Sequence, residues 1–116
     1  MVKPAGARRV SVARGDVWLA ALDPTVGSEI QKTRPCIIIS PPEMHDYLGT
    51  VMVAPMTTGS RPAPFRIAVS FAGKNGLILL DQLRTLDKRR LVRRPGAVQT
   101  KTLHASLARL RDIFAE

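Results

Sequence analysis

Short apolar runs broken by proline and glycine, followed by one helical period, restrict this chain to a small set of folds. We predict strands over residues 16–22, 35–40, 50–54 and 65–70, and a longer extended segment over 76–86. Prolines at 24, 41, 42 and 55 close the early runs, as expected where a chain leaves regular strand pairing. Short strands without helices between them favour a small antiparallel barrel or sandwich over alternating βα units.

The C-terminal segment is predicted to be an amphipathic helix. Thr100 or Thr102 can serve as its N-cap. Its apolar residues recur at helical spacing, at Leu103, Leu107, Leu110 and Phe114. A short helical turn is predicted over 87–91. We expect one domain over residues 13–116, preceded by a flexible basic arm over 1–12.

The charge of the chain favours a polyanionic partner. It has 18 Lys and Arg against 9 Asp and Glu, a formal charge of +9. For so small a domain this points first to nucleic acid, while an acidic protein partner or a merely basic surface is also compatible. No apolar stretch approaches the roughly 18 residues that cross a membrane. The single cysteine, Cys36, excludes an internal disulfide, and its apolar surroundings predict a buried side chain in a cytoplasmic protein.

Several kinds of enzyme site find no support in the sequence. The two histidines, His45 and His104, fall in different predicted elements, and no His, Asp or Glu set has the spacing of metal ligands. There is no nucleophile elbow, Walker loop or dinucleotide fingerprint. The sequence therefore predicts neither a metal nor a cofactor.

A cation held at the start of a strand is the remaining chemical signal. Arg34 follows a polar loop and precedes Pro35, so its guanidinium can face solvent and bind two phosphate oxygens at once. RNA cleavage needs little more, because the 2′-hydroxyl of the substrate can attack the neighbouring phosphate. Glu29 could accept a proton or orient Arg34, and Thr57 offers a hydroxyl. The alternative is a surface ion pair between Arg34 and Glu29.

Several motifs in one order give the chain a family resemblance. They are Arg14-Gly-Asp-Val-Trp18, Asp23-Pro24, Gly27-Ser28-Glu29, Arg34-Pro35, Val53-Ala-Pro-Met-Thr-Thr58 and the stretch Leu79 to Leu91. Over about residues 12–115 the chain resembles the MazF/PemK/Kid toxins. The resemblance implies a mainly β, SH3-like small barrel of the CcdB/PemK type with a C-terminal helix, usually as a homodimer. It also implies a metal-independent endoribonuclease that cuts single-stranded RNA at short sequences and leaves 2′,3′-cyclic phosphate and 5′-hydroxyl ends. A cognate acidic antitoxin would inhibit it.

The resemblance also assigns site residues. Arg34 and Thr57 match the catalytic arginine and threonine of the family, and Glu29 matches its loop glutamate. Ile30 stands where many relatives have Gln, so any base contact of that Gln does not carry over. The residues expected to bind RNA are Ser28, Gln31, Lys32, Thr58, Arg61, Gln82 and Arg84.

Two other functions fit the same barrel. A CcdB-like gyrase poison would be a binding protein without enzymatic activity. That relative acts through a C-terminal Trp-Gly-Ile, whereas this chain ends Asp-Ile-Phe-Ala-Glu. A catalytically idle RNA-binding barrel is the third reading. Fold alone does not separate the three, but Arg34 and Thr57 favour the ribonuclease.

Overall fold

Strands dominate the part of the chain that the computed structural model describes, residues 11–116. In chain order the elements are β1 (Asp16–Ala21), β2 (Thr33–Ile38), α1 (Pro42–Tyr47), β3 (Thr50–Thr57), β4 (Arg66–Phe71), β5 (Lys74–Leu79), η1 (Leu80–Gln82), β6 (Arg84–Asp87), η2 (Lys88–Arg90), β7 (Leu91–Ala97) and α2 (Thr100–Phe114). Here η1 and η2 are 3₁₀ turns. Residues 1–10 of the predicted basic arm lie outside the described residues.

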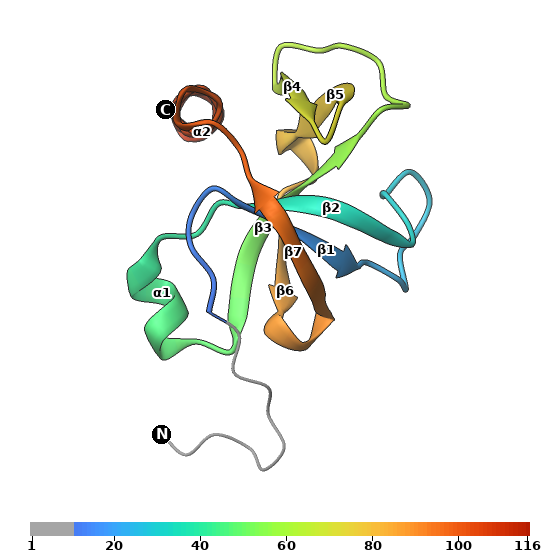
Figure 1. Ribbon diagram of the computed structural model, residues 1–116. Helices are drawn as coiled ribbons and strands as arrows, with labels where there is room; N and C mark the ends of the chain where they lie inside the picture. Colours follow the sequence, from blue (N-terminus) through green and yellow to red (C-terminus); the bar gives the residue numbers. More distant parts are fainter. Residues whose placement is uncertain (1–10) are drawn as a thin grey trace.

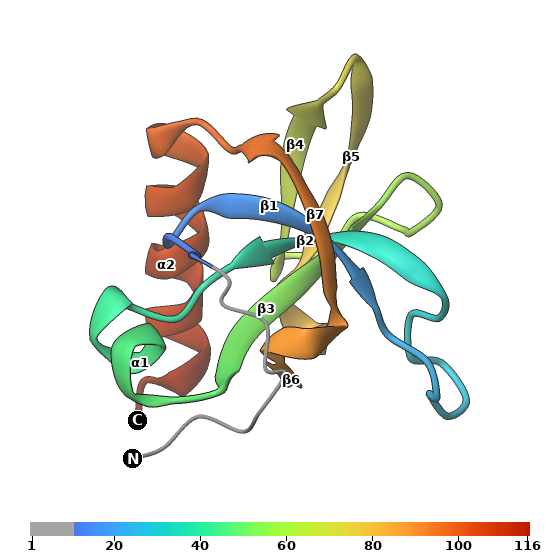
Figure 2. The same cartoon turned by 60° about the horizontal axis from the view of Figure 1, so that its bottom comes forward.

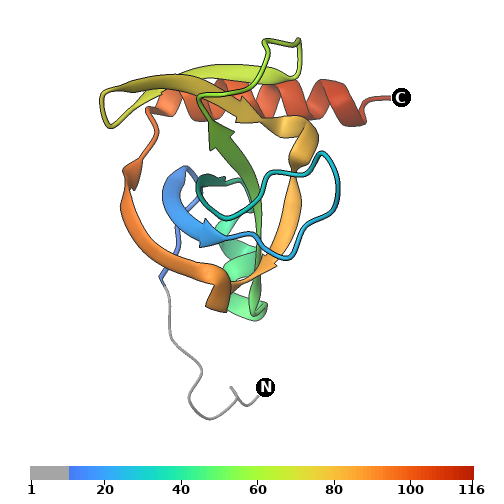
Figure 3. The same cartoon turned by 90° about the vertical axis from the view of Figure 1, so that its right-hand side faces the viewer.

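The strands form one antiparallel sheet in the order β4-β5-β3-β2-β1-β7, and β6 also pairs with β3 (Figure 1). The sheet curls into a half-barrel, with β7 curving around β1 in Figure 3. Helix α2 lies across the β4–β5 side of this curl. The predicted fold class, a mainly β small barrel with a C-terminal helix, is confirmed.

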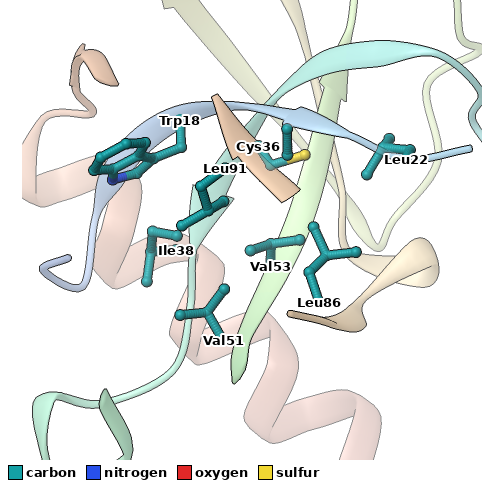
Figure 4. Packing of buried hydrophobic residues seen from close by; sticks show 9 residues of the cluster. Trp18, Leu22, Cys36, Ile38, Val51, Val53, Leu86 and Leu91 are labelled. Carbon is teal, nitrogen blue, oxygen red and sulfur yellow. The ribbon is translucent and has the colours of Figure 1, made fainter. Parts of the chain in front are cut away.

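Two apolar clusters pack on opposite faces of the curled sheet, as the alternation of side chains along a strand dictates. The inner cluster includes Trp18, Cys36, Ile38 and Val53 (Figure 4). The outer cluster lies between the sheet and α2, which runs along the sheet in Figure 2 and contributes Leu110. Cys36 is fully buried, as predicted, and this burial raises the pKa of its thiol to about 12.

Strand β3 was predicted to end before Pro55, and this boundary is wrong. The strand continues to Thr57, and Pro55 pairs with Cys36 of β2. On its other edge β3 pairs with β6 up to Val53 and with β5 from Met56 onward. Pro55 therefore lies in the gap between two ladders, where a missing N–H group removes no hydrogen bond on that side.

The predicted extended segment 76–86 is real but interrupted. It runs along one edge of β3 as β5 and β6, and η1 inserts extra residues between them opposite Pro55. The predicted helical turn near 87–91 is η2. Strand β7 was not predicted, because its burial pattern has one buried residue followed by four exposed ones and lacks a period of two.

The helices also differ in detail from the sequence pattern. Gln99, not Thr100 or Thr102, is the N-cap of α2, because its carbonyl accepts the first helical hydrogen bonds. Phe114 is 71% exposed and continues the apolar spacing without packing on the sheet. Helix α1 was not predicted, because its six residues after Pro41 are too few to show a helical pattern in the sequence.

Candidate active site

Arg34 and Thr57 are placed by the pairing of two neighbouring strands. β2 and β3 pair through Cys36–Pro55, Ile37–Ala54 and Ile38–Val53. The same register, continued to the end of β3, sets Arg34 opposite Thr57. Both side chains line one cavity of about 400 Å³, which we call the strand-end cavity.

The strand-end cavity is cationic at its rim and apolar at its wall. Its three cations come from three separate strands: Arg34 lies on β2, Lys74 on β5 and Arg93 on β7. Thr57 and Thr58 add hydroxyls. Its apolar wall includes Leu19, Pro35, Met56, Val69, Phe71 and Pro95. Among the described residues, no carboxylate lines it. Such a lining favours an anion beside a flat apolar group.

Sequence reasoning missed Lys74 and Arg93. Arg93 reaches the cavity because β7 pairs with β1, where it lies opposite Leu19. Lys74 begins β5, directly after the β4–β5 turn. Neither position carries a motif. The sequence has a dense run of basic residues between 88 and 94, but that run does not indicate where the side chains lie in the fold.

The guanidinium of Arg34 is held at one end and available at the other. Its Nε donates to the carbonyl of Gln31 at 3.2 Å. Within residues 11–116, its Nη groups have no hydrogen bond or ion pair. No ion pair joins it to Glu29 within the described residues, and Glu29 Oε1 instead accepts from the backbone N–H of Val26 at 2.5 Å. The surface ion pair left open by the sequence is therefore absent from the described structure.

The hydroxyl of Thr57 is oriented by the turn that follows β3. Its Oγ1 accepts a hydrogen bond from the backbone N–H of Gly59 at 3.2 Å. Because that bond uses a lone pair of the oxygen, the proton of the hydroxyl stays free to be donated to another group. Thr57 is half-buried and lines the strand-end cavity, so this donor is available to a group bound there.

Glu29 lines a different cavity. This loop cavity has a volume of about 190 Å³, and its polar lining is Glu29, Asp81, Gln82 and Arg84. Gln82 Oε1 accepts from the backbone N–H of Ile30 at 2.8 Å, and Arg84 Nη1 donates to the carbonyl of Leu22 at 3.3 Å. Both predicted RNA-binding residues therefore also fix the backbone around the loop that follows β1.

That loop, residues 23–32, is closed by contacts between its ends. The backbone N–H of Leu22 donates to Lys32 O at 2.9 Å, and the N–H of Lys32 donates to Asp23 Oδ1 at 3.1 Å. Lys32 has a φ of 69°, in the left-handed region that few non-glycine residues adopt. The predicted RNA-binding residues Ser28, Gln31 and Lys32 are exposed here and line neither cavity.

Arg61 is exposed in the loop between β3 and β4 and also lines neither cavity. Its carbonyl accepts from Arg66 Nη1 at 3.0 Å. Arg66 in turn forms a two-point ion pair with Asp81, through Nε–Oδ1 at 3.1 Å and Nη2–Oδ2 at 3.0 Å. The hydrogen bond with Asp81 raises the pKa of Arg66.

No three His, Cys, Asp or Glu side chains in residues 11–116 gather where they could hold a metal ion. No helix in that part of the chain is long and apolar enough to cross a membrane.

The chain has clear relatives among known proteins. It is 34% identical over 106 residues to the endoribonuclease PemK of Escherichia coli, covering 83% of this chain and 80% of that protein. It is 42% identical over 86 residues to the endoribonuclease MazF of Staphylococcus epidermidis, covering 69% of this chain and 72% of that protein. The crystal structure of MazF from Deinococcus radiodurans superposes with a TM-score of 0.78 and 25% identity, over 94% of this chain and all of that one.

Residues 13–114 match the model of one family, described as the PemK-like, MazF-like toxin of type II toxin–antitoxin systems. The match spans most of the chain and includes the strands that carry both cavities. The chain therefore belongs to the PemK-like and MazF-like toxins of type II toxin–antitoxin systems.

Proposed function

We propose that this protein is the endoribonuclease toxin of a toxin–antitoxin pair and that it cleaves single-stranded RNA at the strand-end cavity. The observation that carries the proposal is the lining of that cavity, where three cations and two threonine hydroxyls meet without a carboxylate. The names of the relatives, which are endoribonucleases, support the same activity.

In this mechanism the 2′-hydroxyl of the RNA attacks the adjacent phosphorus. A bond forms between phosphorus and the 2′-oxygen, and the bond to the 5′-oxygen breaks. The proton of the 2′-hydroxyl leaves to a base, and the 5′-oxygen takes up a proton, which gives a 2′,3′-cyclic phosphate and a 5′-hydroxyl. Arg34 binds the non-bridging oxygens, where negative charge grows in the transition state.

Thr57 donates its free proton as a hydrogen bond to the same phosphoryl group, since Gly59 already occupies a lone pair of its oxygen. Arg93 and Lys74 hold the neighbouring backbone phosphate, and the apolar wall beside Phe71 takes a base or ribose. Glu29 lines the loop cavity and not the strand-end cavity, so its role as proton acceptor stays a prediction.

The partners in this proposal follow from charge and family. An acidic cognate antitoxin would cover the cationic rim and compete with RNA for it, in the cytoplasm where both are present. A homodimer remains part of the proposal, and light scattering of the purified protein tests it.

Incubation of purified protein with a long single-stranded RNA in EDTA tests the activity. We expect cleavage, and loss of about a hundredfold or more in rate for Arg34→Ala, the scale of one lost transition-state donor. Arg109→Ala is the matched control, because Arg109 lies exposed on α2 beside Asp112 and lines neither cavity. Equal rates for Arg34→Ala and wild type would remove Arg34 from the site.

A gyrase poison is the second candidate function. It predicts intact RNA and inhibited supercoiling in parallel assays of the same preparation. An idle RNA-binding barrel predicts binding without either effect.

A further inference from the structure

At Gly76, β5 lies so close to the backbone of Thr57 that no side chain larger than hydrogen fits between them. β5 pairs with the end of β3 through Met56–Ile78 and Thr57–Leu77, and Gly76 precedes this pair. A Cβ atom at position 76 would lie 2.6 Å from Thr57 O and 3.2 Å from Thr57 C. A contact as short as 2.6 Å essentially never occurs for a Cβ atom, and the backbone oxygen of a paired strand cannot rotate away as a flexible side chain could.

Close approach, and not backbone conformation, is what demands glycine here. The glycines with positive φ in the described chain are Gly15, Gly27 and Gly73, so the φ of Gly76 is one that alanine adopts freely. The requirement at position 76 therefore comes from the Thr57 peptide itself.

We propose that Gly76 is a positioning residue for the hydroxyl of Thr57. The peptide that faces Gly76 begins the turn in which Gly59 N–H binds Thr57 Oγ1 at 3.2 Å. A methyl group at position 76 would push this peptide away from β5, and the Thr57 hydroxyl would move with it relative to Arg34. This inference rests on the proposed function, because it takes Thr57 as a group that touches RNA.

The effect on catalysis follows from distance. A hydrogen-bond donor that moves by several tenths of an ångström no longer meets the charge that develops on the phosphoryl oxygens. Displacements of about 1 Å reduce enzymatic rates by about a hundredfold. The affinity for uncleaved RNA should change little, because the three cations of the cavity are at other positions.

The test compares Gly76→Ala with Gly49→Ala under single-turnover conditions. Gly49 is the matched control, since a Cβ atom there meets nothing within 4 Å. We expect Gly76→Ala to lower the cleavage rate by about tenfold or more. Its affinity for an RNA made inert by 2′-O-methyl groups should stay near that of wild type, and Gly49→Ala should match wild type in both.

A double-mutant cycle with Thr57→Val shows whether Gly76 acts through Thr57. In the Thr57→Val background, Gly76→Ala should cause no further loss. An equal further loss would overturn the inference, as would wild-type cleavage by Gly76→Ala. Loss of the folded circular dichroism spectrum in Gly76→Ala would also overturn it, because a local displacement leaves the sheet folded.

The same cycle separates this inference from the proposed function. If Thr57→Val alone cleaves like wild type, the assignment of Thr57 fails and Gly76 has nothing to position. If Thr57→Val is impaired while Gly76→Ala is not, the site stands and only the positioning role falls.

Discussion

The strand-end cavity and the loop cavity both include residues from the end of β3 but are built in different ways. Arg34 and Thr57 are set by the register of β2 against β3, so their backbone positions depend on the whole sheet. Glu29 and Ile30 are set by individual contacts, among them the Gln82–Ile30 hydrogen bond and the Glu29–Val26 turn. Register gives a rigid site, whereas single hydrogen bonds give an adjustable one. We therefore assign the rate of cleavage to the first region and the choice of sequence to the second.

The largest expected effect concerns Thr57. Thr57→Val keeps the shape of the side chain and removes the hydroxyl, so cleavage should fall by about a hundredfold. Thr57→Ser restores the hydroxyl and should recover most of the rate. Single-turnover cleavage of one RNA by the three proteins measures this. Similar losses for the valine and serine variants would show that packing, and not the hydroxyl, matters at this position.

A smaller effect on rate, but a change of cleavage pattern, is expected at Gln82. Gln82→Leu leaves the N–H of Ile30 without its acceptor, at a cost of about 1 kcal/mol, and loosens the loop. The rate should stay within about tenfold of wild type, while sequencing of the RNA ends should show new cleavage positions. Gln82→Glu keeps an acceptor oxygen and serves as the control. An unchanged pattern with a large loss of rate would reverse the division between the two regions.

Arg93 should contribute affinity without selecting sequence. Arg93→Ala removes one phosphate contact, so the slope of log affinity against log salt should shrink by about one unit. Binding to inert RNA at several salt concentrations measures the slope. A changed cleavage pattern in this variant would place base recognition in the strand-end cavity after all.

The smallest expected effect is on stability and concerns His45 of α1, which contacts Ser40 just after the end of β2. His45 is buried against Ser40, with Nε2 and Oγ 2.7 Å apart, and desolvation holds its pKa below the usual 6.5. The unfolded chain therefore takes up a proton that the folded chain excludes, so the free energy of unfolding falls as pH drops below about 6.5. Thermal melts at about pH 7.5 and 5 should show this loss in wild type and less of it in His45→Gln. Equal losses would exclude His45 as the cause.

Sequence patterns identified the strands and the candidate site residues better than they predicted the contacts that hold those residues in place. Alternation and buried runs located β1, β2 and the start of β3, because those strands carry both clusters. The end of β3 was misjudged because the tolerance for Pro55 depends on a gap between two partner strands, which only the folded sheet contains.

The sequence did not predict the contributions of Lys74, Arg93 and Gly76, for the same reason. Each acts through a neighbour that is distant in sequence, as Arg93 does beside Leu19 and Gly76 does against Thr57. Motifs are local, so they indicated Arg34, Thr57 and Glu29 but not the division of these residues between two cavities.

The reactivity of Cys36 can report how often β2 separates from its neighbouring strands. Cys36 is the single cysteine, is fully buried, and has a thiol pKa raised to about 12, so almost none of it is the reactive thiolate in the native state. Thiol reagents can modify it only when β2 separates from its neighbours. The labelling rate of the unmodified sequence therefore measures how often the strand that carries Arg34 comes apart.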